Sequence, residues 1–186
     1  MDRIILASAS PRRKQLLEWA EIQFDLVPSD SEELVPEGLP VSEIPVLLAI
    51  HKAAIVRKKV GSEKIILAAD TIVVLNGQML GKPQDRADAI RMLSLLSDQV
   101  HEVITGVALT SAKKEILFAE TTRVRFHRLT RAEIEHYVDH YRPYDKAGAY
   151  AIQEWIGVTG IHSIDGDFYN VMGLPVSRVV KELKSF

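Results

Sequence analysis

The sequence predicts an α/β domain with a mixed, twisted sheet flanked by helices. Runs with the apolar period of a strand alternate with runs of helical period along the 186 residues. The alternation is irregular, which favours a sheet with both parallel and antiparallel pairs. No internal repeat or Gly/Ser-rich linker interrupts it. We therefore predict one domain over residues 1–186, with residues 104–141 as the candidate for a smaller lobe.

The first third of the chain contains two strand-like and two helix-like segments. Pro11 stands where a helix commonly begins, because the first turn does not use the missing N–H. Gly61 can end the second helix. The predicted elements are a strand at residues 3–7, a helix from 11 to about 19, a strand at 24–27, an acidic loop at 29–40 and a helix at about 42–60.

Capping and turn residues locate the elements that follow. Asn76-Gly77 is a strong signal for a two-residue hairpin. Asp85 can cap one helix, and Thr130 with Glu133 forms a capping box for another, whose apolar face includes Tyr137 and Tyr141. The predicted elements are strands at 65–75, 103–110 and 115–126, helices at about 86–96 and 131–141, and, after a Gly-rich stretch of turns, a helix that Pro175 opens.

Composition excludes several classes of protein. The chain has 23 Lys and Arg against 25 Asp and Glu, and this balance argues against a dedicated nucleic-acid or membrane-surface binder. It contains no cysteine, which excludes disulfides, thiolate catalysis and Cys-ligated metals. No stretch approaches the roughly 20 apolar residues of a membrane span. These features predict a cytoplasmic protein.

Asp70 interrupts an apolar run, from residue 65 to residue 75, that is otherwise typical of a fully buried strand. A buried carboxylate is unfavourable unless it is paired, hydrogen-bonded or bound to a metal. One interpretation is a structural Asp that caps a neighbouring loop. The interpretation we favour is a functional acid that holds a divalent cation and accepts a proton from water.

Charged residues are segregated along the chain in a way that suits a phosphate chain carrying a hard cation. The first helix begins with basic residues, where unpaired backbone N–H groups also favour anions. Carboxylates supply the oxygen ligands that such a cation prefers. The basic residues are Arg12, Arg13, Lys14, Lys52 and Lys82, and the acidic cluster is Asp30, Glu32 and Glu33.

Gln153 is a candidate for reading a nucleobase. Its amide offers an acceptor beside donors, which matches the carbonyl and N–H edge of uracil or thymine. Rotated, the same amide matches cytosine. A glutamine that bonds to backbone in a turn is the structural alternative.

Five segments together resemble the Maf family in order and spacing, and the resemblance extends along almost the whole chain. They are LASASPRRKQLL at residues 6–17, AADTIVV at 68–74, GKP at 81–83, DKAGAYAIQ at 145–153 and VMGLP at 171–175. The resemblance implies a fold like that of inosine triphosphate pyrophosphatases, with a cleft between two lobes. It also implies a cytoplasmic, homodimeric nucleoside triphosphate pyrophosphatase with a link to cell-division arrest.

The resemblance also implies site roles, residue by residue. Asp70 matches the catalytic proton acceptor, and Glu33 with Asp70 matches the ligands of Mg²⁺ or Mn²⁺. The remaining matches are Ser10, Arg13, Lys52 and Lys82 for phosphate binding, and Arg12, Thr71 and Gln153 for base specificity. The pattern that ends at Gln153 resembles the subgroup acting on dTTP and UTP, and on related modified pyrimidine nucleotides, rather than on 7-methyl-GTP.

Two other classes remain as alternatives. A nucleotide sensor or partner-binding regulator of septum formation would bind without significant catalysis, but it would not need a water-activating acid such as Asp70. An RNA- or DNA-binding module should show a basic face with aromatic residues, whereas Tyr and Phe are scattered here.

Overall fold

The strands of the computed structural model, which describes residues 3–29, 38–61 and 63–186, form a mixed sheet. Hydrogen bonding links them in the order β2-β1-β3-β5-β6-β7, and β4 pairs with β3. β1 runs parallel to β2 and β3, whereas the β3–β4 and β6–β7 pairs are antiparallel. The strands are β1 (Ile4–Leu6), β2 (Phe24–Leu26), β3 (Ile66–Leu75), β4 (Gln78–Leu80), β5 (Val100–Thr110), β6 (Glu115–Phe126) and β7 (Ile161–Asp165).

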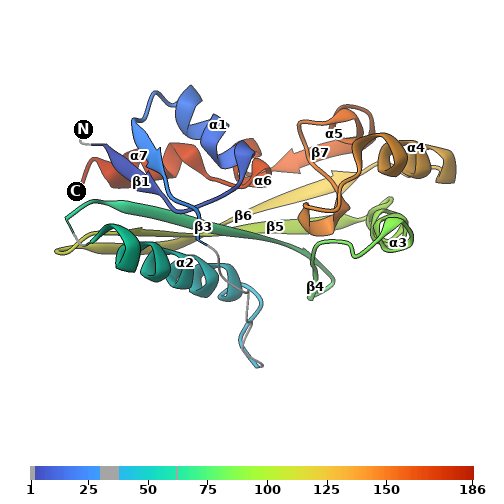
Figure 1. Cartoon of the computed structure of the whole chain (residues 1–186). Helices are drawn as coiled ribbons and strands as arrows, with labels where there is room; N and C mark the ends of the chain where they lie inside the picture. The colour runs from blue at the N-terminus through green and yellow to red at the C-terminus, as the bar shows by residue number, and fades with distance from the viewer. Residues whose placement is uncertain (1–2, 30–37, 62) are drawn as a thin grey trace. The chain divides into compact units, whose positions relative to one another are not determined.

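Helices alternate irregularly with the strands along the chain, as predicted (Figure 1). None of them, in the part of the chain that the structure describes, is long and apolar enough to cross a membrane. The helices are α1 (Pro11–Trp19), α2 (Ile44–Val60), α3 (Arg86–Leu96), α4 (Arg131–Tyr141), α5 (Trp155–Gly160), α6 (Phe168–Met172) and α7 (Val176–Leu183), and η1 (Ala147–Ala149) is a 3₁₀ turn.

The chain divides into two compact units. Unit 1 comprises Met1–Thr71, Thr105–Glu120 and Gly173–Phe186. Unit 2 comprises Ile72–Ile104 and Thr121–Met172. The single domain with a smaller lobe over residues 104–141 stays a prediction.

The caps and the hairpin predicted from the sequence are confirmed. Asp85 Oδ1 accepts a hydrogen bond from the backbone N–H of Asp88 at 2.8 Å, which begins α3. Thr130 and Glu133 form both bonds of the capping box at the start of α4. Asn76 and Gly77 both have positive φ, 50° and 78°, as a tight turn between β3 and β4 requires.

Small residues bring α2 close to the strands of unit 1. Ala49, Ala53 and Val56 of this helix are buried against residues of β1, β3 and β5. At Gly106 of β5 a Cβ atom would lie 2.2 Å from the backbone of Pro45, so only glycine fits this approach. Within unit 1, Figure 1 shows α2 on one face of the strands and α1 with α7 on the other.

A polar group is enclosed among aromatic rings in unit 2. His101 of β5 is 1% exposed, stacks on Phe126 with centroids 5.5 Å apart, and has Nε2 2.7 Å from the Tyr150 hydroxyl. Its Nδ1 has no hydrogen-bond partner among the described residues. Burial lowers the pKa of His101 to about 4 and raises the pKa of Tyr150. His101 is therefore neutral in the folded protein at ordinary pH.

This neutral histidine predicts a loss of stability in mild acid. The unfolded chain binds a proton at His101 below about pH 6.5, whereas the folded chain binds it only near pH 4. The free energy of unfolding should therefore fall as the pH drops through this window, by roughly 3 kcal/mol from this group. Urea denaturation between pH 7 and 4.5 measures the loss, and His101→Gln, which cannot titrate, should lose correspondingly less. Parallel pH profiles for the two proteins would contradict the prediction.

Candidate active site

Asp70 lies in the middle of β3, as predicted from the sequence, and is 6% exposed. Its neighbours along the strand are apolar on both sides except for Thr71. Asp70 Oδ1 accepts a hydrogen bond from Nζ of Lys52, which lies on α2 beside the alanines that contact the sheet. The partner of the carboxylate is therefore a cation on a neighbouring helix, and this geometry does not match the alternative of a loop cap.

The Lys52–Asp70 ion pair is enclosed. The side chains are 12% and 8% exposed. Removing two charges from water is unfavourable, and the attraction between them often only offsets that desolvation. Stability alone therefore gives little reason for such a pair. The pair is the strongest structural indication of a site in unit 1.

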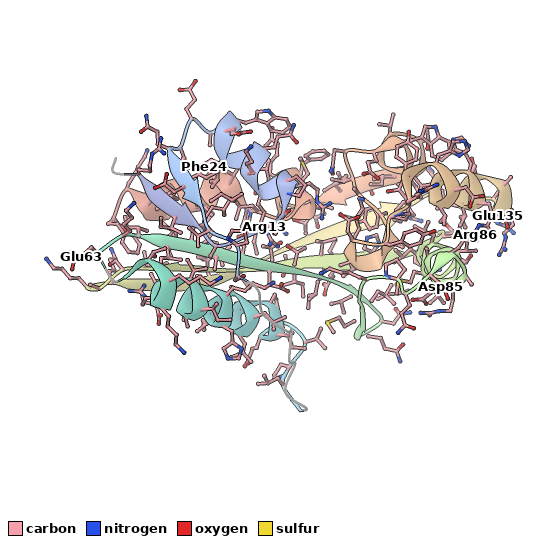
Figure 2. All side chains as sticks on the ribbon, viewed as in Figure 1. Arg13, Phe24, Glu63, Asp85, Arg86 and Glu135 are labelled. Carbon is pink, nitrogen blue, oxygen red and sulfur yellow. The ribbon has the colours of Figure 1, made fainter. Side chains whose placement is uncertain are left out.

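Arg13 is buried beside β3 and joins three segments of unit 1 (Figure 2). Its Nε donates to the carbonyl oxygen of Gly173 at 2.7 Å, and its Nη1 donates to Ser8 Oγ at 3.2 Å. Its Nη2 donates to Thr71 Oγ1 at 3.0 Å, next to Asp70. Thr71 and Asp70 are successive residues of β3, so their side chains point to opposite faces of the sheet, and Arg13 holds the backbone beside Asp70 from the face opposite to Lys52.

The other residues predicted near the start of α1 have distinct positions. Ser10 is the N-cap of α1, and its Oγ accepts a hydrogen bond from the Arg13 N–H at 3.5 Å. Arg12, one residue before Arg13, is partly exposed. Thr71 Oγ1 lies 2.9 Å from Thr105 Oγ1 of β5 and so connects two strands. The structure therefore places Ser10, Arg13, Thr71, Asp70 and Lys52 in one unit.

Unit 2 holds the remaining two described residues, Lys82 and Gln153. Both are exposed. The segments that carry them are joined, because the Gly148 N–H donates to the Gly81 carbonyl oxygen at 3.0 Å. Two motifs more than sixty residues apart in sequence are therefore adjacent within this unit.

Glu33, the second predicted metal ligand, lies outside the described residues. Among the residues that are described, no group of three or more His, Cys, Asp and Glu side chains is arranged to hold a metal ion. The oxygen donor of Asp70 nevertheless fits Mg²⁺ or Mn²⁺. Mg²⁺ is commonly held by one or two carboxylates together with substrate phosphates and water.

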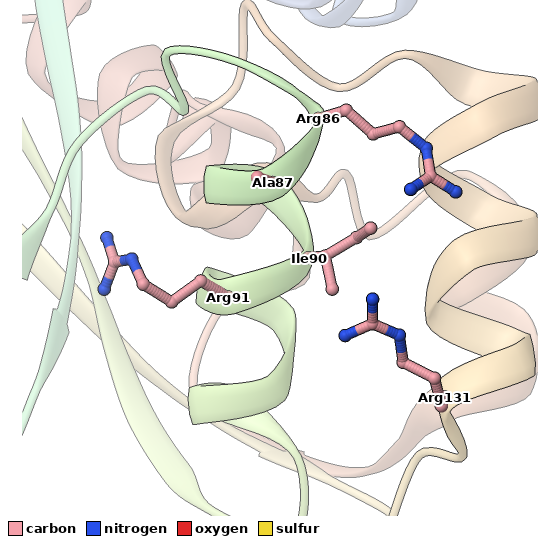
Figure 3. A pocket seen from close by; sticks show the side chains of 5 residues that line it. All are labelled: Arg86, Ala87, Ile90, Arg91 and Arg131. Atoms are coloured by element: carbon pink, nitrogen blue, oxygen red, sulfur yellow. The ribbon is translucent and has the colours of Figure 1, made fainter.

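A hollow of about 520 Å³ lies in unit 2 and contains none of the predicted site residues. Figure 3 shows Arg86 and Arg131 beside Ile90 in this hollow, with Arg91 on the other side of α3. Each guanidinium already has an acidic partner, which offsets its charge, so we do not place the triphosphate here. These partners are Asp139, Asp88 and Glu135, for Arg86, Arg91 and Arg131 in turn.

Several supporting residues were not singled out from the sequence. Ser8 and Gly173 hold Arg13, and Thr105 holds Thr71. Thr105 is fully buried in β5, but threonine is common in strands and gives no signal comparable to that of a buried carboxylate. Lys146, 8% exposed and paired with Asp145 at 2.7 Å, carries no such signal in its own sequence neighbourhood.

Comparison with known proteins gives a consistent result over the full chain. The family model described as Maf-like protein matches residues 3–186. A protein of Bacteroides fragilis named dTTP/UTP pyrophosphatase is 48% identical over 183 residues, which are 98% of this chain and 95% of that protein. A Bacillus cereus protein of the same name is 48% identical over 186 residues, 100% of this chain and 96% of that protein.

A solved structure supports the fold. The structure of a HAM1 protein from Coxiella burnetii matches with a TM-score of 0.55 at 17% identity and covers 100% of both chains. At this identity the likeness concerns the fold alone. It confirms the expected fold class, a mixed sheet with helices like that of inosine triphosphate pyrophosphatases, whereas the cleft between two lobes stays a prediction.

Proposed function

The chain belongs to the Maf family, and we propose that it is a nucleoside triphosphate pyrophosphatase that acts on dTTP and UTP, with a house-cleaning role in nucleotide metabolism. It would hydrolyse the α–β phosphoanhydride and release a monophosphate and pyrophosphate. The observation that carries the proposal is Asp70, a buried carboxylate in an apolar strand that is paired with Lys52. The relatives named for this activity are nearly half identical over almost the full length.

Asp70 is proposed as the general base. Its carboxylate would accept the proton of the attacking water, directly or through a second water. The Lys52 ammonium orients this carboxylate, because it donates to Oδ1. An ammonium has three donors, so Lys52 can hold Asp70 and also contact a phosphate oxygen.

The basic residues and the N-terminus of α1 are proposed to bind the phosphates. Positive charge at Arg13, Lys52 and Lys82 would stabilise the charge that accumulates on the leaving pyrophosphate. Ser10 lies at the first turn of α1, where backbone N–H groups favour anions. Arg12, Thr71 and Gln153 are proposed to determine which base is accepted.

A divalent cation, Mg²⁺ or Mn²⁺, is proposed to be held by Asp70 and Glu33. When bound, it would bind the phosphates and lower the pKa of the attacking water. The homodimer, the cytoplasmic location and the link to cell-division arrest stay predictions.

Product analysis across nucleotides tests the proposed function. We expect dTTP and UTP to give dTMP and UMP with pyrophosphate, faster than purine triphosphates or 7-methyl-GTP. EDTA should abolish the release and Mg²⁺ or Mn²⁺ should restore it. Chromatography of the nucleotide together with a pyrophosphate assay distinguishes this cleavage from loss of the terminal phosphate.

Two results would contradict the proposal. Formation of dTDP and inorganic phosphate would place the cleavage at the wrong bond. Tight binding of dTTP with no hydrolysis in either metal would favour the nucleotide-sensing regulator instead.

A further inference from the structure

Gln153 is carried by a tight turn in unit 2. The Glu154 N–H donates to the Ala151 carbonyl oxygen at 3.1 Å, which closes a four-residue turn with Gln153 inside it. Ala151 and Ile152 are 5% and 3% exposed, whereas Gln153 is exposed. The turn therefore exposes the Gln153 side chain, whereas Ala151 and Ile152 beside it are buried.

One hydroxyl group contacts both ends of this turn. Tyr137 of α4 is fully buried, and its hydroxyl oxygen accepts a hydrogen bond from the Ala151 N–H at 3.2 Å. The same hydroxyl donates to Glu154 Oε2. Residues 151 and 154 are the first and last of the turn, so the Tyr137 hydroxyl links its two ends in addition to the backbone hydrogen bond.

Two further contacts hold the same segment. Lys146 Nζ lies 3.5 Å from Glu154 Oε1, so this carboxylate has a second partner. A Cβ atom at Gly157 would lie 1.8 Å from the Ile152 carbonyl oxygen, so the following helix approaches the turn as closely as glycine allows. The turn is thus held by the Tyr137 side chain of α4 and by the close approach of the α5 backbone at Gly157.

We propose that Tyr137 is a positioning residue for Gln153 and thereby determines base selectivity. This inference rests on the proposed function, in which Gln153 contacts the base. A bidentate amide-to-base contact requires both atoms to be placed within a fraction of an ångström, and small displacements weaken it steeply. The Tyr137 hydroxyl touches no substrate in this scheme and acts only through the turn.

Tyr137→Phe tests the proposal, because it removes the hydroxyl and keeps the ring that packs in the core. We expect KM for dTTP to rise about 10-fold while kcat changes little, and the preference for dTTP over dCTP in kcat/KM to fall about 10-fold. The matched control is Tyr141→Phe, the same change one turn along α4. Tyr141 stacks on Tyr137 with centroids 5.0 Å apart and is 39% exposed, and its variant should keep the wild-type selectivity.

A double-variant comparison separates positioning from a general structural role. If Tyr137 acts through Gln153, then Tyr137→Phe should change selectivity little in a Gln153→Ala background. Glu154→Ala, which removes the other partner of the hydroxyl, should reproduce the selectivity loss and serves if the first variant folds poorly. Unchanged selectivity in a folded Tyr137→Phe protein, or fully additive effects with Gln153→Ala, would overturn the proposal.

These outcomes are distinguishable from failure of the proposed function. A wild-type protein that hydrolyses no triphosphate would refute the function itself. A wild-type protein that prefers dTTP, with a preference that Tyr137→Phe leaves intact, would refute only the positioning role.

Discussion

Asp70→Asn is expected to lower kcat for dTTP by about 10²-fold or more, the usual contribution of a general base. The amide has nearly the shape of the carboxylate, but it cannot accept a proton from water. It is also a weaker ligand for a hard cation. Steady-state release of pyrophosphate with saturating Mg²⁺ measures the effect.

The Lys52–Asp70 pair requires a control, because the same substitution removes the charge that Lys52 faces. Asp25→Asn is the matched variant in unit 1. Asp25 lies on β2 and is paired with Arg3 and Lys64. The Asp25→Asn variant therefore also loses ion pairs, but at the surface. Asp25→Asn should keep wild-type kcat, and Asp70→Asn should still bind a non-hydrolysable dTTP analogue. Wild-type turnover by Asp70→Asn would show that another group activates the water.

The long elements of the fold were predictable because local and tertiary preferences agree there. The hairpin at Asn76 and the cap at Asp85 each depend on the residues of a single turn, and both occur where the sequence placed them. Asp70 was identifiable for a similar reason. A carboxylate in an apolar strand needs a partner, and this holds whatever the partner is.

The segment between α4 and α7 shows where sequence reasoning failed. We expected only turns there, but η1, α5, β7 and α6 lie in this stretch. These elements are short, and β7 is defined by its pairing with β6 rather than by its own pattern. Strand β5 likewise begins at Val100, three residues before the predicted start.

Contacts between side chains that are distant in the sequence could not be predicted either. Tyr141 shares the apolar spacing of Tyr137, yet it is exposed, whereas Tyr137 is buried and contacts the turn at Ala151. Lys52 and Arg13 were both expected to bind phosphate. Sequence spacing contains nothing that makes one a partner of Asp70 and the other a buried link to Gly173.

Arg13→Lys is expected to lower the free energy of unfolding by roughly 3 kcal/mol or more, and to lower activity with it. Lysine keeps the charge but lacks the planar fork, so it cannot serve the three acceptors that the guanidinium reaches. A hydrogen bond from a charged donor contributes about 1.5 to 3 kcal/mol, and a lysine ammonium would keep only part of the three. Chemical denaturation of the two proteins at pH 7 measures the difference.

The comparison variant for Arg13 is Lys14→Ala on the same helix. Lys14 and Glu18 are 51% and 54% exposed and lie 3.5 Å apart, so their pair should contribute less than about 1 kcal/mol. A role for Arg13 confined to phosphate binding predicts a different pattern, in which Arg13→Lys keeps wild-type stability and loses only substrate affinity. That pattern would show that the hydrogen bonds of Arg13 to Ser8, Thr71 and Gly173 contribute little to the stability of the fold. Loss of both properties would mean that the guanidinium holds the segments around Asp70 in a way that a lysine ammonium of the same charge cannot.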